Sequence, residues 1–199
     1  MRVIFKNTTA VNSLNLKYLC SKDELRPAFS GVYIDLRNDC MVATDAHKLV
    51  VYPIEIVQKD DVPEDKQEFI VPIRFFEEKR YMMDIPPKSK RVLELDYILT
   101  DDYAEVYFLG ELVFRCKYIQ ANFPDYEKIL PSKKDKVQLD QIGISMKIVY
   151  ELTKAIPNDG LNNYKLSFFG QNKAILLESL NLDLNRPIKA ILMPILLQN

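Results

Sequence analysis

The chain has 199 residues, of which 48% are apolar and 28% are charged, and its formal net charge is −1. This balance argues against a strongly basic surface that binds nucleic acid by charge alone, although a basic patch on one face is compatible with it. Three cysteines, an odd number without CxxC spacing, predict reduced thiols rather than a disulfide framework. The first residues lack a signal-peptide pattern and the apolar runs are too short to span a bilayer, so we expect a soluble cytoplasmic protein without a membrane partner.

The first part of the chain predicts a short helix followed by strands. The helix is expected near 11–20, and a turn is expected at 37–40 (RNDC) because Asn and Asp tolerate turn dihedrals. The polar segment 58–68 predicts an exposed loop. Three strands are predicted here, at 31–36, 41–44 and 49–56.

The middle of the chain repeats this order. A second helix is predicted over 70–84, with Pro72 in its first turn, where the missing N–H costs no hydrogen bond. This helix must end before Pro86 and Pro87, which cannot continue it. Three further strands are predicted, at 91–99, 104–109 and 111–119.

The last part of the chain shows the order a third time. A helix is predicted over 142–158, with Ser145 as its N-cap and Pro157 as its end. One apolar stripe at helical spacing consists of Ile148, Val149, Leu152, Ala155 and Ile156. The final strands are predicted at 164–169, 173–179 and 188–197.

The chain therefore contains three successive units, each a helix followed by three strands. A repeat of this kind indicates that one supersecondary unit was used several times. Taken by itself, the pattern predicts an α+β protein whose sheets are mostly antiparallel.

Five local sequences carry a more specific signal when their order is considered. They are RPAFSGVYIDL (26–36), VATDAHKLVVYPI (42–54), FIVPIRFFEE (69–78), ANFPDYEKILP (121–131) and KAILMPILL (189–197). Together they resemble the bacterial replicative sliding clamp, the beta subunit of DNA polymerase III. NFPDYEKILP is the most specific of these segments, and ATDAHKL is the second.

The resemblance implies a fold and a domain organisation. The fold is a DNA-clamp-like α+β fold of repeated helix-plus-antiparallel-sheet units, of which this chain has three. Residues 1–133 would form a complete clamp-like domain of two units, similar to the family's middle domain. Residues 134–199 would form a partial domain of one unit, similar to the second half of the family's last domain. The family's first domain and the first half of its last have no expected counterpart.

The resemblance also implies a hydrophobic groove in which partner proteins dock short linear peptides. Apolar residues next to a few polar ones suit such a groove, because a peptide anchor needs apolar area bounded by polar groups. Carried over position by position, the groove residues are Phe29, Gly31, Thr44, Ala46, His47, Lys48, Leu49, Pro124, Lys128, Ile129, Ile175, Ile191, Met193, Pro194, Ile195 and Leu196.

Four of these positions depart from the family pattern, and one of them is Leu196, which stands where the family usually has an arginine. Ala46 stands where the family usually has Gly, and Lys48 and Lys128 stand where it usually has Arg. Both lysines are expected to steer acidic residues or a terminal carboxylate of the peptide, although lysine lacks the two-pronged grip of arginine. Ser145 and Ile148 replace the Asn and Tyr often found beside the groove.

Plainer interpretations of the same residues remain open. Residues 193–196 can simply end a core strand, and His47, the single histidine of the chain, can be a structural histidine. One histidine without clustered cysteines predicts no metal site. Asp45 and His47 have no nucleophile partner, and no phosphate-binding glycine loop occurs, so we expect neither catalytic residues nor a cofactor.

Clamps encircle duplex DNA and present basic side chains to its phosphates without reading the bases, so a weak set of DNA contacts is also implied. Its members are Lys17, Lys22, Arg74, Lys79, Arg80, Lys147 and Lys154. Ordinary solvated helix charges are the alternative interpretation.

The leading hypothesis is a non-enzymatic sliding-clamp-like protein of DNA replication or repair, which tethers DNA polymerase or repair proteins to duplex DNA. The alternative is a reduced clamp relative, an adaptor or decoy that binds peptides without forming a ring or binding DNA. A homo-oligomer is expected, with two copies pairing through their third units about a two-fold axis.

Overall fold

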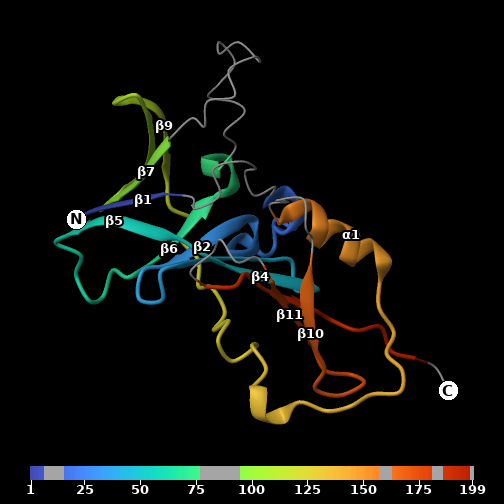
Figure 1. Cartoon of the computed structure of the whole chain (residues 1–199). Coiled ribbons are helices and arrows are strands. Elements are labelled where there is room, and N and C mark those ends of the chain that lie inside the picture. The colour runs from blue at the N-terminus through green and yellow to red at the C-terminus, as the bar shows by residue number, and fades with distance from the viewer. Residues whose placement is uncertain (7–15, 77–94, 157–162, 181–185, 198–199) are drawn as a thin grey trace, which may run out of the picture.

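The computed structural model describes residues 1–6, 16–76, 95–156, 163–180 and 186–197. Within these ranges the chain forms two antiparallel sheets, short 3-10 helices and the α-helix α1 (Met146–Ala155). The five-stranded sheet lies at one end of the molecule, and α1 with strands β10 and β11 lies at the other (Figure 1). The predicted α+β class with mostly antiparallel sheet is therefore confirmed.

The five-stranded sheet has the order β5-β1-β7-β8-β9, and each neighbouring pair is antiparallel. Its strands are β1 (Arg2–Lys6), β5 (Glu55–Asp60), β7 (Leu95–Thr100), β8 (Tyr103–Phe108) and β9 (Glu111–Lys117).

The seven-stranded sheet has the order β10-β11-β12-β4-β3-β2-β6. Its strands are β2 (Gly31–Asp35), β3 (Cys40–Thr44), β4 (Lys48–Pro53), β6 (Glu68–Pro72), β10 (Tyr164–Ser167), β11 (Ile175–Ser179) and β12 (Lys189–Leu192). Strand β12 pairs with β4, and Ile191 lies opposite Leu49. The sheet thus joins strands from both sides of the domain boundary expected at 133. The boundary and the count of three units remain predictions.

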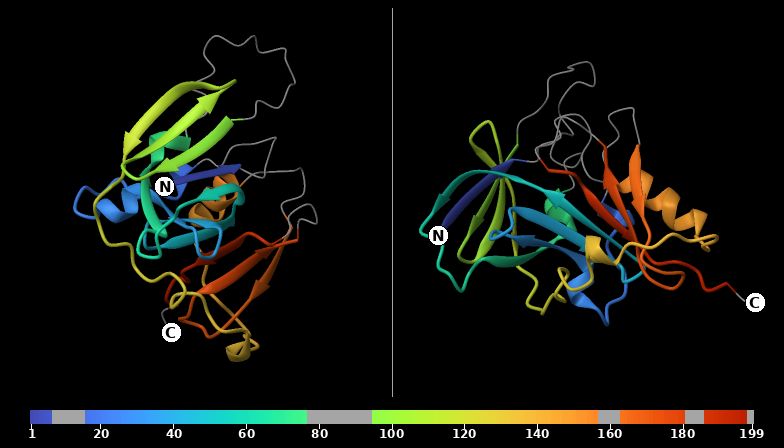
Figure 2. Two further views of the ribbon diagram at one scale, coloured as in Figure 1. Left: turned by 90° about the vertical axis from the view of Figure 1, so that its left-hand side faces the viewer. Right: turned by 60° about the horizontal axis from the view of Figure 1, so that its bottom comes forward.

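The two sheets are connected at two places. Strand β4 continues through Ile54 into β5, so that one stretch of chain contributes to both sheets. Just beyond β9, the N–H of Ile119 donates to the carbonyl of Ile70 in β6 at 2.8 Å. Figure 2 shows β7–β9 at one end and β10 and β11 at the other in both further views.

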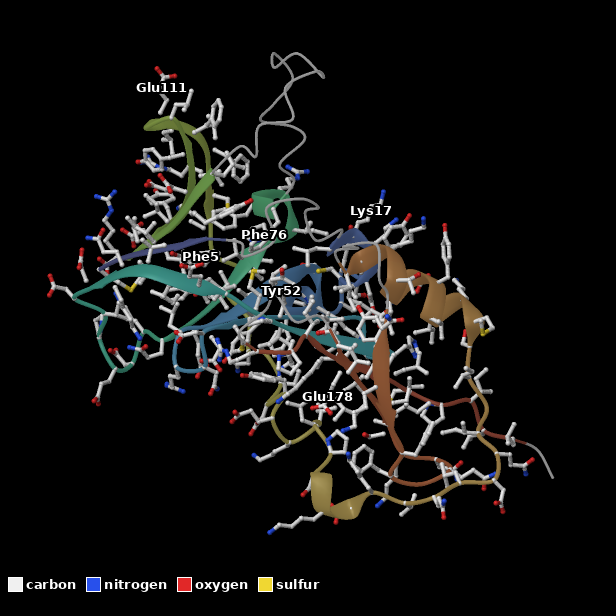
Figure 3. The ribbon with its side chains drawn as sticks, in the orientation of Figure 1. Phe5, Lys17, Tyr52, Phe76, Glu111 and Glu178 are labelled. Atoms are coloured by element: carbon white, nitrogen blue, oxygen red, sulfur yellow. The ribbon has the colours of Figure 1, made fainter. Side chains whose placement is uncertain are left out.

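Two apolar clusters lie on opposite faces of the seven-stranded sheet, because successive side chains of a strand point to opposite faces. The larger cluster includes Val50 and Leu192 and extends under α1 and into the five-stranded sheet, where Phe5 stacks on Tyr97 and Phe76 contacts the same ring (Figure 3). The smaller cluster forms on the other face, around Leu49, Ile191, Tyr33, Leu176 and Tyr126.

The predicted third helix is confirmed and is shorter than expected, from Met146 to Ala155. The side chain of Ser145 caps it by accepting from the N–H of Ile148. Leu152, Ala155 and Ile156 are buried, and Ile148 and Val149 pack against the larger cluster. Pro157, its predicted end, lies outside the described residues.

The predicted second helix is wrong at its beginning. Residues Glu68–Pro72 form strand β6, which pairs with β2, and a 3-10 helix, η3 (Ile73–Phe76), follows. Proline is tolerated at Pro72 because β6 is an edge strand of the seven-stranded sheet. The rest of that predicted helix, and residues 11–15 of the first, lie outside the described residues, while η1 (Leu16–Tyr18) is the described part of the first.

The predicted strands are confirmed where the structure describes them, with bounds that differ by up to five residues. Residues 91–94 of the strand predicted at 91–99 lie outside the described residues. The long strand predicted at 49–56 is divided between β4 and β5, and β5 extends three residues into the segment that was expected to be a loop. Strand β1 was not predicted at all.

Candidate peptide-binding groove

The loop between β3 and β4 is held by its own polar side chains. Thr44 Oγ1 donates to the carbonyl of Lys48 at 2.7 Å, and Asp45 Oδ1 accepts from the backbone N–H groups of His47 and Lys48 at 3.0 Å each. Ala46 has a φ of 76°, in the left-handed region that glycine adopts most easily. The loop therefore turns sharply and leaves the His47 side chain exposed.

Lys48 is buried with its charge paired, and its side chain is 3% exposed. The amine donates to Asp45 within its own loop and to Glu151 Oε2 of α1 at 2.7 Å. Burial by itself lowers the pKa of Lys48, but the hydrogen bonds and negative charges of the two acids outweigh it, so the pKa lies above its ordinary value. The chain's own carboxylates thus occupy the amine that was expected to steer an acidic peptide.

The C-terminal segment runs along this loop. The N–H of Met193 donates to the carbonyl of His47 at 3.1 Å, and the N–H of Ile195 donates to the carbonyl of Gly143 at 2.9 Å. The side chains of Met193, Ile195 and Leu196 are exposed by 40%, 50% and 70%. The segment is therefore fixed through its backbone while its apolar side chains face solvent.

The FPDY segment covers the smaller apolar cluster. Phe123 stacks on Tyr33 with ring centroids 4.6 Å apart, and Phe29 meets the edge of Phe123 at 6.1 Å. Tyr126 is buried in the same cluster. This cluster also contains Leu49 and its partner in β12, Ile191. This segment passes on the side of the sheet away from α1 (Figure 1).

The remaining residues of this segment form an exposed rim. Pro124, Lys128 and Ile129 are all exposed. The amine of Lys128 lies 2.9 Å from Asp125 Oδ2, and its side chain is 84% exposed. The charge and hydrogen bond of Asp125 raise the pKa of Lys128. Unlike Lys48, this lysine remains accessible to a ligand.

Most of the predicted groove residues therefore lie around one face of the seven-stranded sheet. Gly31 lies at the close contact between β2 and β6, where a Cβ atom would come within 2.8 Å of the Val71 carbonyl. Ile175 and Lys48 are exceptions on the opposite face. The side chain of Ile175 lies in the larger cluster, and Lys48, which is paired with Leu192 of that cluster, reaches Glu151 of α1. Leu176 and Ala174 contact the smaller cluster instead, and sequence analysis missed both.

The predicted DNA-contacting residues that the structure describes lie on the helical side. Lys17 is on η1, Arg74 on η3, and Lys147 and Lys154 on α1, with η1 packed against both α1 and η3. Figure 3 shows Lys17 beside α1. Lys22 follows η1 in the chain. Lys79 and Arg80 lie outside the described residues.

Metal ligands and thiols are the other reactive side chains to consider in the ranges that the structure describes. No group of three or more His, Cys, Asp or Glu side chains is placed to hold a metal ion within those ranges. The three cysteines are free, and burial raises the pKa of Cys20 to about 12 and those of Cys40 and Cys116 to about 11. No helix of the described ranges is long and apolar enough to cross a membrane.

Solved structures share this fold. The DNA polymerase sliding clamp of Bacillus subtilis superposes with a TM-score of 0.70 over 100% of this chain and 65% of that chain, at 14% sequence identity. The Helicobacter pylori beta clamp, in a structure with a bound DNA ligase peptide, gives a TM-score of 0.64 over 98% of this chain and 66% of that chain, at 16% identity.

Sequence comparison identifies the family. The Beta sliding clamp of Borreliella burgdorferi is 27% identical over 125 residues, which are 61% of this chain and 29% of that protein. This chain thus spans under a third of the sequence relative and about two thirds of the solved clamps. The family model for the central domain of the DNA polymerase III beta subunit matches residues 9–125, more than half of the chain. The chain therefore belongs to the DNA polymerase III beta subunit family.

Proposed function

We propose that this protein acts as a non-enzymatic sliding-clamp module, which tethers partner proteins to duplex DNA through a hydrophobic peptide-binding groove. The observation that carries this proposal is the meeting of four sequence-distant segments around one sheet face. These segments are 29–31, 44–49, 123–129 and 191–196, and they combine buried apolar pairs such as Leu49–Ile191 with exposed apolar side chains at the rim.

The exposed apolar side chains support a docking role. Ile129, Met193, Ile195 and Leu196 are all at least 40% exposed, and the backbone N–H of Met193 is bonded to the carbonyl of His47. Peptide sites combine apolar anchors with a few polar groups that fix the direction of the peptide. The bound DNA ligase peptide of the Helicobacter pylori beta clamp supports peptides of DNA polymerases or repair proteins as partners.

Peptide titration tests this proposal. The probe is the DNA ligase peptide observed with the Helicobacter pylori clamp, fluorescently labelled and followed by anisotropy. Met193→Ala and Ile129→Ala each remove exposed apolar anchor area and should weaken binding about tenfold, the size of a moderate hot spot. Leu109→Ala is the matched control, since Leu109 is 86% exposed at the β8–β9 turn of the other sheet. No binding at millimolar peptide would contradict the groove.

We propose that basic side chains of α1 contact the DNA. Lys147 and Lys154 are exposed on α1 and can meet phosphates without reading bases. Duplex affinity measured at two salt concentrations should fall in Lys147→Gln/Lys154→Gln, and the dependence on salt should become shallower. An unchanged affinity and slope would remove DNA contact from α1.

For the assembly, we propose that copies of the chain associate through strand β10. It lies at the edge of the seven-stranded sheet, and such an edge offers unpaired backbone groups to another strand. Its Leu166 is 50% exposed. Light scattering at micromolar concentration should give more than one copy, and Leu166→Lys should return the protein to a monomer. A monomer without the substitution would contradict this contact.

A further inference from the structure

A polar cleft of about 740 Å³ opens beside the groove. It lies between the segment that begins at η1, the loop before β4, and α1. Its lining residues are Lys17, Tyr18, Cys20, Ser21, Lys22, Asp23, Arg26, Asp45, His47, Lys48 and Glu151. The cleft is thus dominated by charged side chains, in contrast to the apolar groove.

Five of its seven charged side chains form ion pairs with one another. Lys48 is held between Asp45 and Glu151. Arg26 Nε lies 3.5 Å from Asp23 Oδ2. These groups have partners within the chain, so they are poorly placed to attract a further charge.

Lys17 and Lys22 differ from them. Both side chains are exposed, and neither amine has a carboxylate within ion-pair distance among the described residues. The amine of Lys17 lies 5.1 Å from the ring centroid of Tyr18, a cation–π contact that leaves its hydrogen-bond donors available. Four basic side chains and three carboxylates line the cleft, which leaves one formal positive charge. A single carboxylate matches that charge better than a polyanion does.

The cleft and the groove share the loop that carries His47. This residue lines the cleft, while its carbonyl accepts the hydrogen bond from Met193 of the groove. Because both sites meet at His47, a peptide that contacts Met193 can extend one of its flanks toward this cleft.

We propose that this cleft binds one acidic group of the docked peptide, a Glu or Asp side chain or the terminal carboxylate, through Lys17 and Lys22. The inference rests on the proposed function, since it requires a peptide in the groove. Lys48 was expected to attract such a group, but its amine is already paired with Asp45 and Glu151. Lys17 and Lys22 would take this role instead. Duplex DNA is a poorer occupant, because three carboxylates in the lining would repel a continuous row of phosphates.

The test compares peptides that differ by one charge. The labelled DNA ligase peptide is extended at either end by Glu or by the isosteric Gln, and the affinity of each version is measured at low and at physiological salt. The better-placed Glu version should bind about fivefold more tightly than its Gln partner at low salt, the size expected for one or two exposed charge pairs. This ratio should shrink as salt screens the charges.

Two double variants locate the effect. Lys17→Gln/Lys22→Gln should reduce the Glu-to-Gln ratio to about one while the Gln peptides still bind. Lys134→Gln/Lys136→Gln removes the same charge from exposed lysines that do not line the cleft, and it should leave the ratio unchanged.

Each other outcome decides against the inference. If the Glu and Gln peptides bind equally well to the unsubstituted chain, the cleft inference is wrong and the groove stands. If no version binds, the proposed function itself fails. If both double variants lower the Glu-to-Gln affinity ratio equally, the preference for Glu comes from the overall charge of the protein and not from the cleft. If only duplex binding is lost in Lys17→Gln/Lys22→Gln, the two lysines contact phosphates instead.

Discussion

The hydroxyl of Tyr126 donates a 2.9 Å hydrogen bond to Oδ2 of Asp35, although 91 positions separate the two residues in the sequence. The side-chain amide of Asn38 donates to the same oxygen at 2.8 Å, and the backbone N–H of Arg37 donates to Oδ1 at 2.9 Å. Tyr126 and Asp35 are both buried. A polar network therefore fastens the FPDY segment to the turn between β2 and β3 and holds the rim of the groove in place.

Removing the Tyr126 hydroxyl should loosen this attachment. Tyr126→Phe keeps the ring that packs on Tyr33 but leaves Asp35 with one donor fewer. Because the acceptor is a buried carboxylate, we expect a loss of about 1–3 kcal/mol in the free energy of unfolding. Urea denaturation measures this loss.

A second tyrosine provides the control. The Tyr107 hydroxyl also donates to a carboxylate, that of Glu105 two residues away, but it belongs to a half-buried side chain on the other sheet. Tyr107→Phe should cost less than Tyr126→Phe, because Arg115 still pairs with the buried Glu105 carboxylate at 2.6 Å after the hydroxyl is removed. Equal losses in the two variants would show that the Tyr126 hydroxyl has no special role.

The stability of the protein should depend on pH through Asp35. Burial raises the pKa of this carboxyl, but the hydrogen bonds from Asn38, Tyr126 and the backbone outweigh it, so the pKa lies below its ordinary value of 3.8. A depressed pKa contributes stability above pH 3.8, and this contribution is lost as pH falls through the folded-state pKa. Asp35→Asn should therefore be less stable at pH 7, and the gap should close on acidification below about pH 4.

Unfolding measured at several pH values checks this prediction. The exposed Asp140 gives the control, and Asp140→Asn should leave the pH profile unchanged. A stability gap between Asp35→Asn and the unsubstituted chain that stays constant down to pH 2 would contradict the assignment.

The backbone of Ala46 should make the loop before β4 sensitive to branched residues. At a φ of 76°, the side chain of a β-branched residue is disfavoured more strongly than that of alanine. Ala46→Val should lose about 1–2 kcal/mol of stability. Ala46→Gly, the residue that the family resemblance implies here, should change stability by less than about 1 kcal/mol, because relief of strain is offset by a more flexible unfolded chain. Thermal unfolding of both variants tests this, and a neutral Ala46→Val would contradict it.

Local sequence patterns were enough to predict the strands that are joined by tight turns and the residue at which α1 begins. Asp39, in the predicted turn 37–40, has a φ of 47°, which Asp tolerates, and Ser145 accepts the capping hydrogen bond that its position predicts. These features depend on neighbours within a few residues, so the sequence alone contains the information. Residues of the segments that resemble the clamp family also lie close together, because β12 pairs with β4 and Tyr126 belongs to the same cluster as Leu49.

Features that depend on distant partners could not be predicted in this way. Strand β11 is apolar on both faces, so alternation could not show that Leu176 rather than Ile175 faces the groove side. Pro72 ends a strand and begins no helix, because β2 pairs with that segment from 41 positions away. Lys48 looked like an exposed steering charge, since nothing local indicates that Glu151 of α1 covers it.

The pairing of Lys48 leads to a comparison of two lysines. Lys48 and Lys128 each form an ion pair with an Asp three residues away, but their side chains are 3% and 84% exposed. Lys48→Met should cost about 2–4 kcal/mol, because Asp45 and Glu151 then face each other, largely buried, without a cation. Lys128→Met should cost less than about 1 kcal/mol, because its pair is screened by solvent.

Urea denaturation of the two methionine variants measures this difference, and the pH dependence gives an independent check. Because the folded-state pKa of Lys48 lies above its ordinary value of 10.5, its contribution is complete below that pH and is lost as pH rises through the folded-state pKa. The deficit of Lys48→Met should therefore be constant from pH 7 to 10 and narrow only above it. Equal costs for the two substitutions would show that burial does not strengthen the bridge between the loop and α1.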